Sequence, residues 1–135
     1  MTDTRQMLEA SPKPPPLDLG TVAAAIDACL NCVQTCSTCA DSDLIEEDVG
    51  AMRACIALCQ TCADTCDVTA RVLSRPGQWD PEVVRPLLEA CVRACTTCGD
   101  ECDRHAEHHR HCAVCADACR KCIQACEAVL GAERG

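Results

Sequence analysis

The spacing of the cysteines constrains the fold of this chain more than any other feature. Seventeen of its 135 residues are cysteine, and inside each of four blocks the step from one cysteine to the next is three or four residues. Such steps place side chains on one face of a helix, whereas a strand would need steps of two. The blocks are Cys29, Cys32, Cys36 and Cys39; Cys55, Cys59, Cys62 and Cys66; Cys91, Cys95, Cys98 and Cys102; and Cys112, Cys115, Cys119, Cys122 and Cys126. The sequence therefore predicts four helices, each with a continuous cysteine face.

Composition and charge exclude several classes of protein. Phe and Tyr are absent and Trp79 is the single tryptophan, so an aromatic core is excluded. The net charge of −9, from 12 basic and 21 acidic residues, disfavours a nucleic-acid partner. We expect no apolar stretch approaching the roughly 18–20 residues that span a bilayer, and hence no membrane partner. The first nine residues lack the apolar segment of an export signal, so we expect a cytoplasmic protein.

A cytoplasmic location limits what the cysteines can do. Thiols stay reduced there, so a dense set of cysteines indicates metal binding or redox activity rather than disulfides. An odd number of cysteines also cannot pair completely within one chain. Free cysteine packs as a small hydrophobic residue, which accounts for a few inward-facing cysteines. It does not account for seventeen in one register, because they would leave a thin core.

Residues outside the blocks predict where the helices begin and end. Residues 1–20 form an N-terminal extension, in which Thr4 to Ala10 favours a short helix and Ser11 to Pro16 a stiff Pro-rich linker. The acidic run 41–48, followed by Gly50, indicates a solvated first connection, whose charge would also attract cations.

The later boundaries are marked by proline and capping residues. Ser74 to Gly77 ends the second helix, and Asp80, Pro81 and Glu82 begin the third. Pro86, one turn further, predicts either a kink or a later start. Residues 103–110 contain neither Gly nor Pro, so one unbroken helix over residues 81–130 is an alternative.

We expect a turn at residues 103–110, because four similar blocks can then enclose one core. The predicted fold class is all-α: an up-down-up-down four-helix bundle over residues 21–135, preceded by the short extension.

The chemistry that needs a face of thiols is metal coordination. Residues three or four apart on a helix have Cβ atoms about 5–6 Å apart, so their sulfur atoms can share a metal ion. Zinc prefers four tetrahedral ligands, and seventeen thiols do not divide into fours. The cysteine run typical of iron–sulfur proteins is absent. Cu(I) is soft and accepts two or three thiolates, and bridging sulfurs give a capacity of about 15–20 ions per chain.

The two ends of the predicted bundle differ. Met52 continues the second cysteine face by one step, and His105 and His109 continue the third, which places all three at one mouth as weaker copper ligands. We assign no role to His108 and His111, which suit a solvated polar turn. The opposite end is predicted to be closed by apolar side chains, namely Val22, Ile26, Leu73, Val84, Leu88, Val129 and Leu130.

Four helices with Cys-x-x-x-Cys pairs and a histidine-rich third connection make residues 21–130 similar to the copper storage proteins in their cytosolic form. These are cysteine-lined four-helix bundles. The resemblance implies storage of many Cu(I) ions inside the bundle, assembly as a homotetramer, and uptake at a His- and Met-lined end. It places all seventeen cysteines at core-ligand positions and His105 and His109 at the mouth. Exported relatives carry a twin-arginine leader, which this sequence lacks.

Other functional classes fit less well. A zinc-binding cysteine-rich protein and a copper chaperone are the alternatives, although a chaperone needs one exposed site rather than seventeen buried thiols. We expect no enzyme, since a thiol oxidoreductase would need one exposed, low-pKa pair. Exchange of copper with a chaperone or chelator is a further expectation. Leu30, Val68 and Val114 lie off the cysteine faces and are candidates for a subunit interface.

Overall fold

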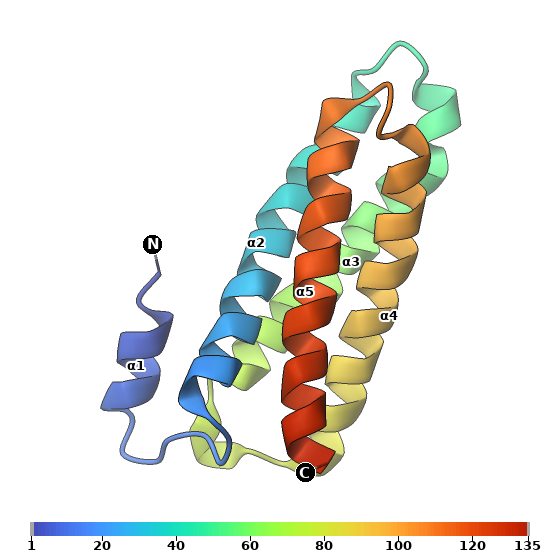
Figure 1. Cartoon of the computed structure of the whole chain (residues 1–135). Coiled ribbons are helices and arrows are strands. Elements are labelled where there is room, and N and C mark those ends of the chain that lie inside the picture. The colour runs from blue at the N-terminus through green and yellow to red at the C-terminus, as the bar shows by residue number, and fades with distance from the viewer. Residues whose placement is uncertain (1, 135) are drawn as a thin grey trace.

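Five α-helices make up the computed structural model of the chain, which describes residues 2–134 (Figure 1). Residues 1 and 135, the outer limits of the two predicted domain ranges, lie outside this part. The elements are α1 (Thr4–Ala10), α2 (Leu19–Leu44), the 3₁₀ turn η1 (Val49–Met52), α3 (Arg53–Leu73), the 3₁₀ turn η2 (Pro76–Gln78), α4 (Pro81–His105) and α5 (Arg110–Arg134).

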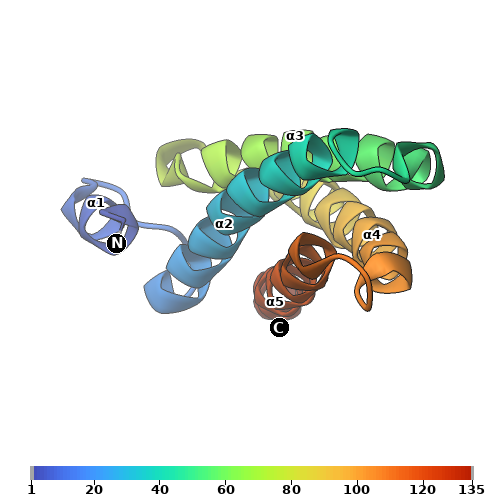
Figure 2. The same cartoon turned by 90° about the horizontal axis from the view of Figure 1, so that it is seen from above.

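The four long helices form the predicted antiparallel bundle. Helix α2 packs on α3 and α5, and α4 packs on the same two helices, so each helix has two neighbours around the core (Figures 1 and 2). The α2–α3 and α4–α5 connections lie together at the upper end in Figure 1. We call this end the mouth and the opposite end the closed end. The all-α bundle predicted from the cysteine spacing is confirmed.

Helix boundaries at the closed end follow the capping residues. Helix α3 stops at Leu73, and α4 starts at Pro81 with the Asp80 carboxylate accepting a hydrogen bond of 2.9 Å from the Glu82 amide. Pro86 lies inside α4, which already begins at Pro81, so the alternative of a later start at Pro86 is excluded. Both boundaries were predicted correctly.

Boundaries at the mouth are less regular. Helix α4 ends at His105 and α5 begins at Arg110, so the turn is real and the continuous helix is excluded. The solvated loop predicted over residues 41–48 is wrong in its first half. Helix α2 continues through Leu44, and the side chain of Asp43 is fully buried. The helix extends because Asp43 lies four residues after Cys39 and so continues the inward face.

The bundle interior contains sulfur in its middle and aliphatic carbon at its closed end. All seventeen cysteines are buried with at most 1% of their surface exposed. The seven aliphatic residues predicted to close the far end are also buried, each at most 4% exposed. Small residues bring the helices close: a Cβ on Gly99 of α4 would lie only 3.2 Å from the Cβ of Cys119 in α5.

The N-terminal extension packs against the bundle. Leu8 of α1 is buried, and the hydroxyl groups of Thr2 and Thr4 donate hydrogen bonds of 2.7 and 2.6 Å to one oxygen of Asp27 on α2. Figure 2 shows α1 on the outside of the bundle, beside α2 and near the C-terminal end of α3, away from α4 and α5. The linker then reaches the closed end, where Lys13 donates a hydrogen bond of 3.2 Å to the carbonyl of Gly77 in the α3–α4 connection.

Helix α2 meets the length and composition of a membrane span, contrary to the expectation that no stretch would do so. An 18-residue window within it has a mean hydropathy of 1.3. Its buried residues include Cys29, Cys32, Cys36 and Cys39, which face the other helices. A single helix of this kind is weak evidence of a span, since the core helix of a globular bundle has the same properties.

Candidate metal centre

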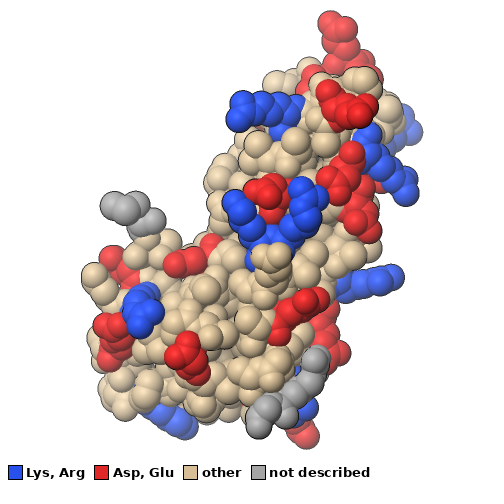
Figure 3. Space-filling view, viewed as in Figure 1, with Lys and Arg blue, Asp and Glu red and all other residues tan. Residues whose placement is uncertain are grey.

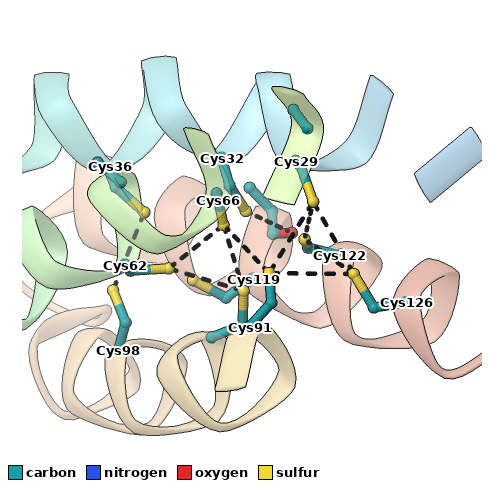
Figure 4. Close-up of a cluster of buried hydrophobic side chains, with 14 of the residues drawn as sticks. Cys29, Cys32, Cys36, Cys62, Cys66, Cys91, Cys98, Cys119, Cys122 and Cys126 are labelled. Carbon is teal, nitrogen blue, oxygen red and sulfur yellow. Dashed lines mark hydrogen bonds between the residues drawn. The ribbon is translucent and has the colours of Figure 1, made fainter. Parts of the chain in front are cut away.

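The cysteine sulfur atoms touch one another along the bundle axis. Neighbouring Sγ atoms lie 3.6–4.0 Å apart, both within a helix and between helices (Figure 4). For example, Cys29 Sγ on α2 is 3.6 Å from Cys122 Sγ on α5. A metal–thiolate bond is about 2.3 Å long, so two sulfur atoms up to about 4.6 Å apart can bind one ion. The spacing suits shared metal ions throughout the core.

Several groups of four ligand atoms lie within 4.8 Å of one another. These groups overlap: Cys66 and Cys122 occur together in two of them, and Cys39 and Cys115 occur together in another and each in one more. Separate tetrahedral zinc sites would need separate sets of four thiols. Overlapping sets suit an ion that accepts bridging sulfur atoms. Five of these groups are Cys29, Cys66, Cys91 and Cys122; Cys32, Cys66, Cys95 and Cys122; Cys36, Cys98, Cys115 and Cys119; Cys39, Cys59, Cys102 and Cys115; and Cys39, Asp43, Cys112 and His111.

The Cys112 thiol is held in its protonated form in the absence of metal. Burial, together with the nearby charges of Cys55 and Asp43, raises the pKa of the Cys112 thiol. Cys32 donates a hydrogen bond of 3.3 Å to the backbone carbonyl of Ala118 on α5 (Figure 4). Because the thiolate is the ligand, each metal ion that binds must displace thiol protons.

His111 is the mouth imidazole that reaches the thiols. Its Nδ1 lies 3.4 Å from Cys39 Sγ and 3.6 Å from Cys112 Sγ, and these two sulfur atoms are 3.8 Å apart. No role for His111 was predicted from the sequence. Its position nonetheless follows the same rule as the other ligands, because it precedes Cys115 by four residues and so lies on the cysteine face of α5.

Asp43 is the second residue that the sequence analysis missed at this site. Its Oδ1 accepts a hydrogen bond of 3.6 Å from Cys112 Sγ, whereas Oδ2 is buried without a hydrogen-bond partner. Burial raises the pKa of Asp43 to about 7. An orphaned carboxylate oxygen beside two thiols and an imidazole is a ready ligand for a cation.

The two histidines predicted for the mouth are present there and contact carboxylates. His105 Nε2 lies 2.8 Å from Glu101 Oε2. His109 Nδ1 lies 2.9 Å from Glu46 Oε2, and its Nε2 lies 3.2 Å from Asp48 Oδ2. The hydrogen bond to Asp48 raises the pKa of His109. Acidic side chains also project from this end in the space-filling view (Figure 3).

Met52 is fully buried at the end of η1, one step before the cysteine face of α3. Its position agrees with the register that placed it at the mouth. A buried methionine also fills space as an ordinary core residue, so its role as a ligand stays a prediction.

A helical bundle whose interior is filled by mutually touching, reduced thiols defines a class: proteins that hold many soft metal ions through thiolates. The sequence profile of one family, copper storage protein, matches residues 20–131 of this chain. The chain therefore belongs to the copper storage protein family. None of the curated protein sequences compared with it matches.

Solved structures of one bacterial protein share the fold. The copper storage protein Ccsp from Streptomyces lividans, loaded with 10 copper equivalents, is 44% identical, with a TM-score of 0.93 over 96% of this chain and 98% of that chain. A form with five coppers is 48% identical, with a TM-score of 0.82 over 83% and 93%. A variant with one histidine changed to alanine is 46% identical, with a TM-score of 0.85 over 87% and 98%.

Proposed function

We propose that this protein stores Cu(I) in the cytosol by binding many ions to the thiolates inside the bundle, which also keeps the metal from harmful reactions. The observation that carries the proposal is the set of seventeen buried thiols, whose sulfur atoms lie in overlapping groups with many Sγ–Sγ contacts of 3.6–4.0 Å. Membership of the copper storage family points to storage rather than catalysis. The related protein Ccsp is described as cytosolic, which supports the cytosolic location.

Uptake through the mouth follows from the contrast between the two ends. The closed end is blocked by aliphatic side chains, whereas the mouth carries imidazoles, carboxylates and the buried Met52. In the proposed route, ions meet His105 and His109 first and pass by His111 to Cys39 and Cys112. The weaker nitrogen ligands then release the ions to stronger thiolates further inside.

We infer assembly as a homotetramer through apolar side chains on the outer helix faces. Leu30, Val68 and Val114 are 38%, 48% and 47% exposed. Their burial between subunits would stabilise the assembly, since exposed apolar groups gain free energy on burial. Analytical ultracentrifugation at micromolar concentration tests this, and a monomer alone would contradict it. A copper chaperone or a small thiol chelator is the proposed exchange partner.

Anaerobic titration of the reduced protein with Cu(I), against a competing chelator, tests the storage function. We expect about 15–20 tightly bound ions per chain, because each sulfur can bridge two coppers. In a parallel competition, Zn²⁺ should displace little of this copper. Tight zinc binding at about four ions per chain, the tetrahedral limit for seventeen thiols, would instead support the zinc alternative. A capacity of one ion would support the chaperone alternative.

A further inference from the structure

The outer face of the mouth contains a cluster of nitrogen and oxygen ligands that differs in chemistry from the thiol core. Glu46 Oε2 lies 2.9 Å from His109 Nδ1 and 2.8 Å from His111 Nε2, so one carboxylate oxygen joins two imidazoles. The two rings are stacked with their centroids 5.6 Å apart. The side chains are 30%, 13% and 22% exposed, so the cluster is reachable from solvent but partly enclosed.

The far side of each imidazole also faces a carboxylate. His109 Nε2 lies 3.2 Å from Asp48 Oδ2, and His111 Nδ1 lies 3.7 Å from Asp43 Oδ1. Histidines that bind metals characteristically direct their second nitrogen to a carboxylate, which fixes the ring and raises its basicity. Asp43 lies on the thiol side of His111, in one group of possible ligands with Cys39 and Cys112. The cluster thus has both the ligands and the supporting carboxylates of a metal site.

We propose that Glu46, His109 and His111 bind one divalent cation of the zinc type at the outer face of the mouth, with Asp48 and Asp43 supporting the two rings. Two imidazoles and a carboxylate are hard to borderline ligands, which suit Zn²⁺, Co²⁺ or Ni²⁺ rather than Cu(I). With bonds of about 2.0–2.2 Å in a tetrahedral site, two ligand atoms lie about 3.3–3.5 Å apart, so each nitrogen must move about 0.5 Å away from its present contact with Glu46 to admit the ion.

The site would control copper uptake through the two nitrogens of His111. A neutral imidazole has one lone pair, because its other nitrogen carries the proton. When Nε2 binds the divalent cation, Nδ1 keeps a proton directed at Cys39 and Cys112. When Nδ1 binds Cu(I), Nε2 keeps a proton directed at Glu46. Outer divalent metal and inner copper therefore exclude each other at His111. This step rests on the proposed storage function, whereas the outer site itself does not.

Co²⁺ is the probe for the outer site, because its absorption spectrum reports the ligands. Anaerobic titration of the reduced, metal-free protein should give one Co²⁺ with weak visible bands and no sulfur-to-cobalt band in the near ultraviolet. Glu46→Gln should abolish this binding. Asp48→Asn should weaken it by about 10- to 100-fold, the usual effect of losing a carboxylate behind a ligating histidine.

Glu101→Gln is the matched control. Glu101 contacts His105 at 2.8 Å on the same rim but joins no second imidazole, so its loss should leave Co²⁺ binding unchanged. Circular dichroism verifies that each variant is folded. Two results would overturn the proposal: a spectrum with sulfur-to-cobalt bands alone, or equal Co²⁺ binding by the parent, Glu46→Gln and Asp48→Asn. Either would show that the cluster is only a hydrogen-bonded network.

Stopped-flow uptake of Cu(I) tests the exclusion. One equivalent of Co²⁺ should slow uptake in the parent and in Glu101→Gln, but not in Glu46→Gln. If Co²⁺ does not change the rate of uptake while many Cu(I) ions still bind, only the proposed competition between the two metals at His111 is refuted. Failure to bind many Cu(I) ions even without Co²⁺ would refute the storage function instead.

Discussion

His111 Nδ1 lies 3.4 Å from Cys39 Sγ and joins the polar mouth of the bundle to its sulfur interior. The other nitrogen of the same ring contacts Glu46 at the surface. Within the part of the chain that the structure describes, no other imidazole at the mouth contacts both a thiol and a surface carboxylate. His111 is therefore the residue whose replacement should affect copper transfer most.

Replacement of His111 by Ala should slow the first phase of Cu(I) uptake by about tenfold, similar to the loss of other groups that support a metal site. Total capacity should fall by no more than one or two ions, because the seventeen thiols remain. His105→Ala, on the same rim, should have a smaller effect. Stopped-flow measurement of both variants decides the matter, and an equal effect of the two would contradict the assigned role of His111.

Cysteines near the closed end should determine capacity rather than rate. Cys66 and Cys91 are 3.8 Å apart and lie far from the mouth along α3 and α4. Replacing both with Ala should lower the number of bound Cu(I) ions while the first ions bind at the parental rate. Chelator competition gives the capacity and stopped-flow gives the rate. A slower first phase with unchanged capacity would place the uptake route at the closed end.

Asp43→Asn should stabilise the metal-free protein more at pH 8 than at pH 5. Burial raises the pKa of Asp43 to about 7, from 3.8 in an unfolded chain. As the pH rises from 4 to 7, the unfolded chain loses this proton while the folded protein keeps it, so stability falls. Above pH 7, where Asp43 is also ionised in the folded protein, the free-energy cost of its buried charge no longer changes with pH. Asparagine avoids the charge and still accepts a hydrogen bond from Cys112.

Thermal unfolding of the reduced protein across this pH range measures the effect. Asp41→Asn, at an exposed position on the same helix, is the control and should show no comparable trend. A gain from Asp43→Asn that is the same at pH 5 and pH 8 would mean that the buried charge is not its cause.

Gly99→Ala should destabilise the bundle by about 1 kcal/mol. The added Cβ would lie 3.2 Å from the Cβ of Cys119, close to the backbone of α5 where little can move. Overpacking costs about 1–3 kcal/mol, which outweighs the gain of about 1 kcal/mol in helix propensity. Gly131→Ala on α5 meets nothing within 4 Å and should instead be stabilising. Chemical denaturation of both variants under reducing conditions makes the comparison, and a more stable Gly99→Ala would contradict it.

The sequence alone determined the helices, their cysteine faces and the distinction between the two ends. A step of three or four residues has one structural meaning, because only a helix repeats on that period. The boundaries at Asp80 and Pro81 followed from local chemistry as well, since capping acts between near neighbours. Even the short helix from Thr4 to Ala10 was predicted with its correct limits.

Only the tertiary structure decided which polar residues at the mouth meet the thiols. His105, His109 and His111 all lie within one turn of a helix end, and the sequence separates them from Asp43 and Glu46 by about sixty residues. Periodicity gives the face on which a side chain lies but not its partner on a neighbouring helix. That partner depends on how α2 and α5 are rotated and shifted against each other, which is set by packing of the whole core.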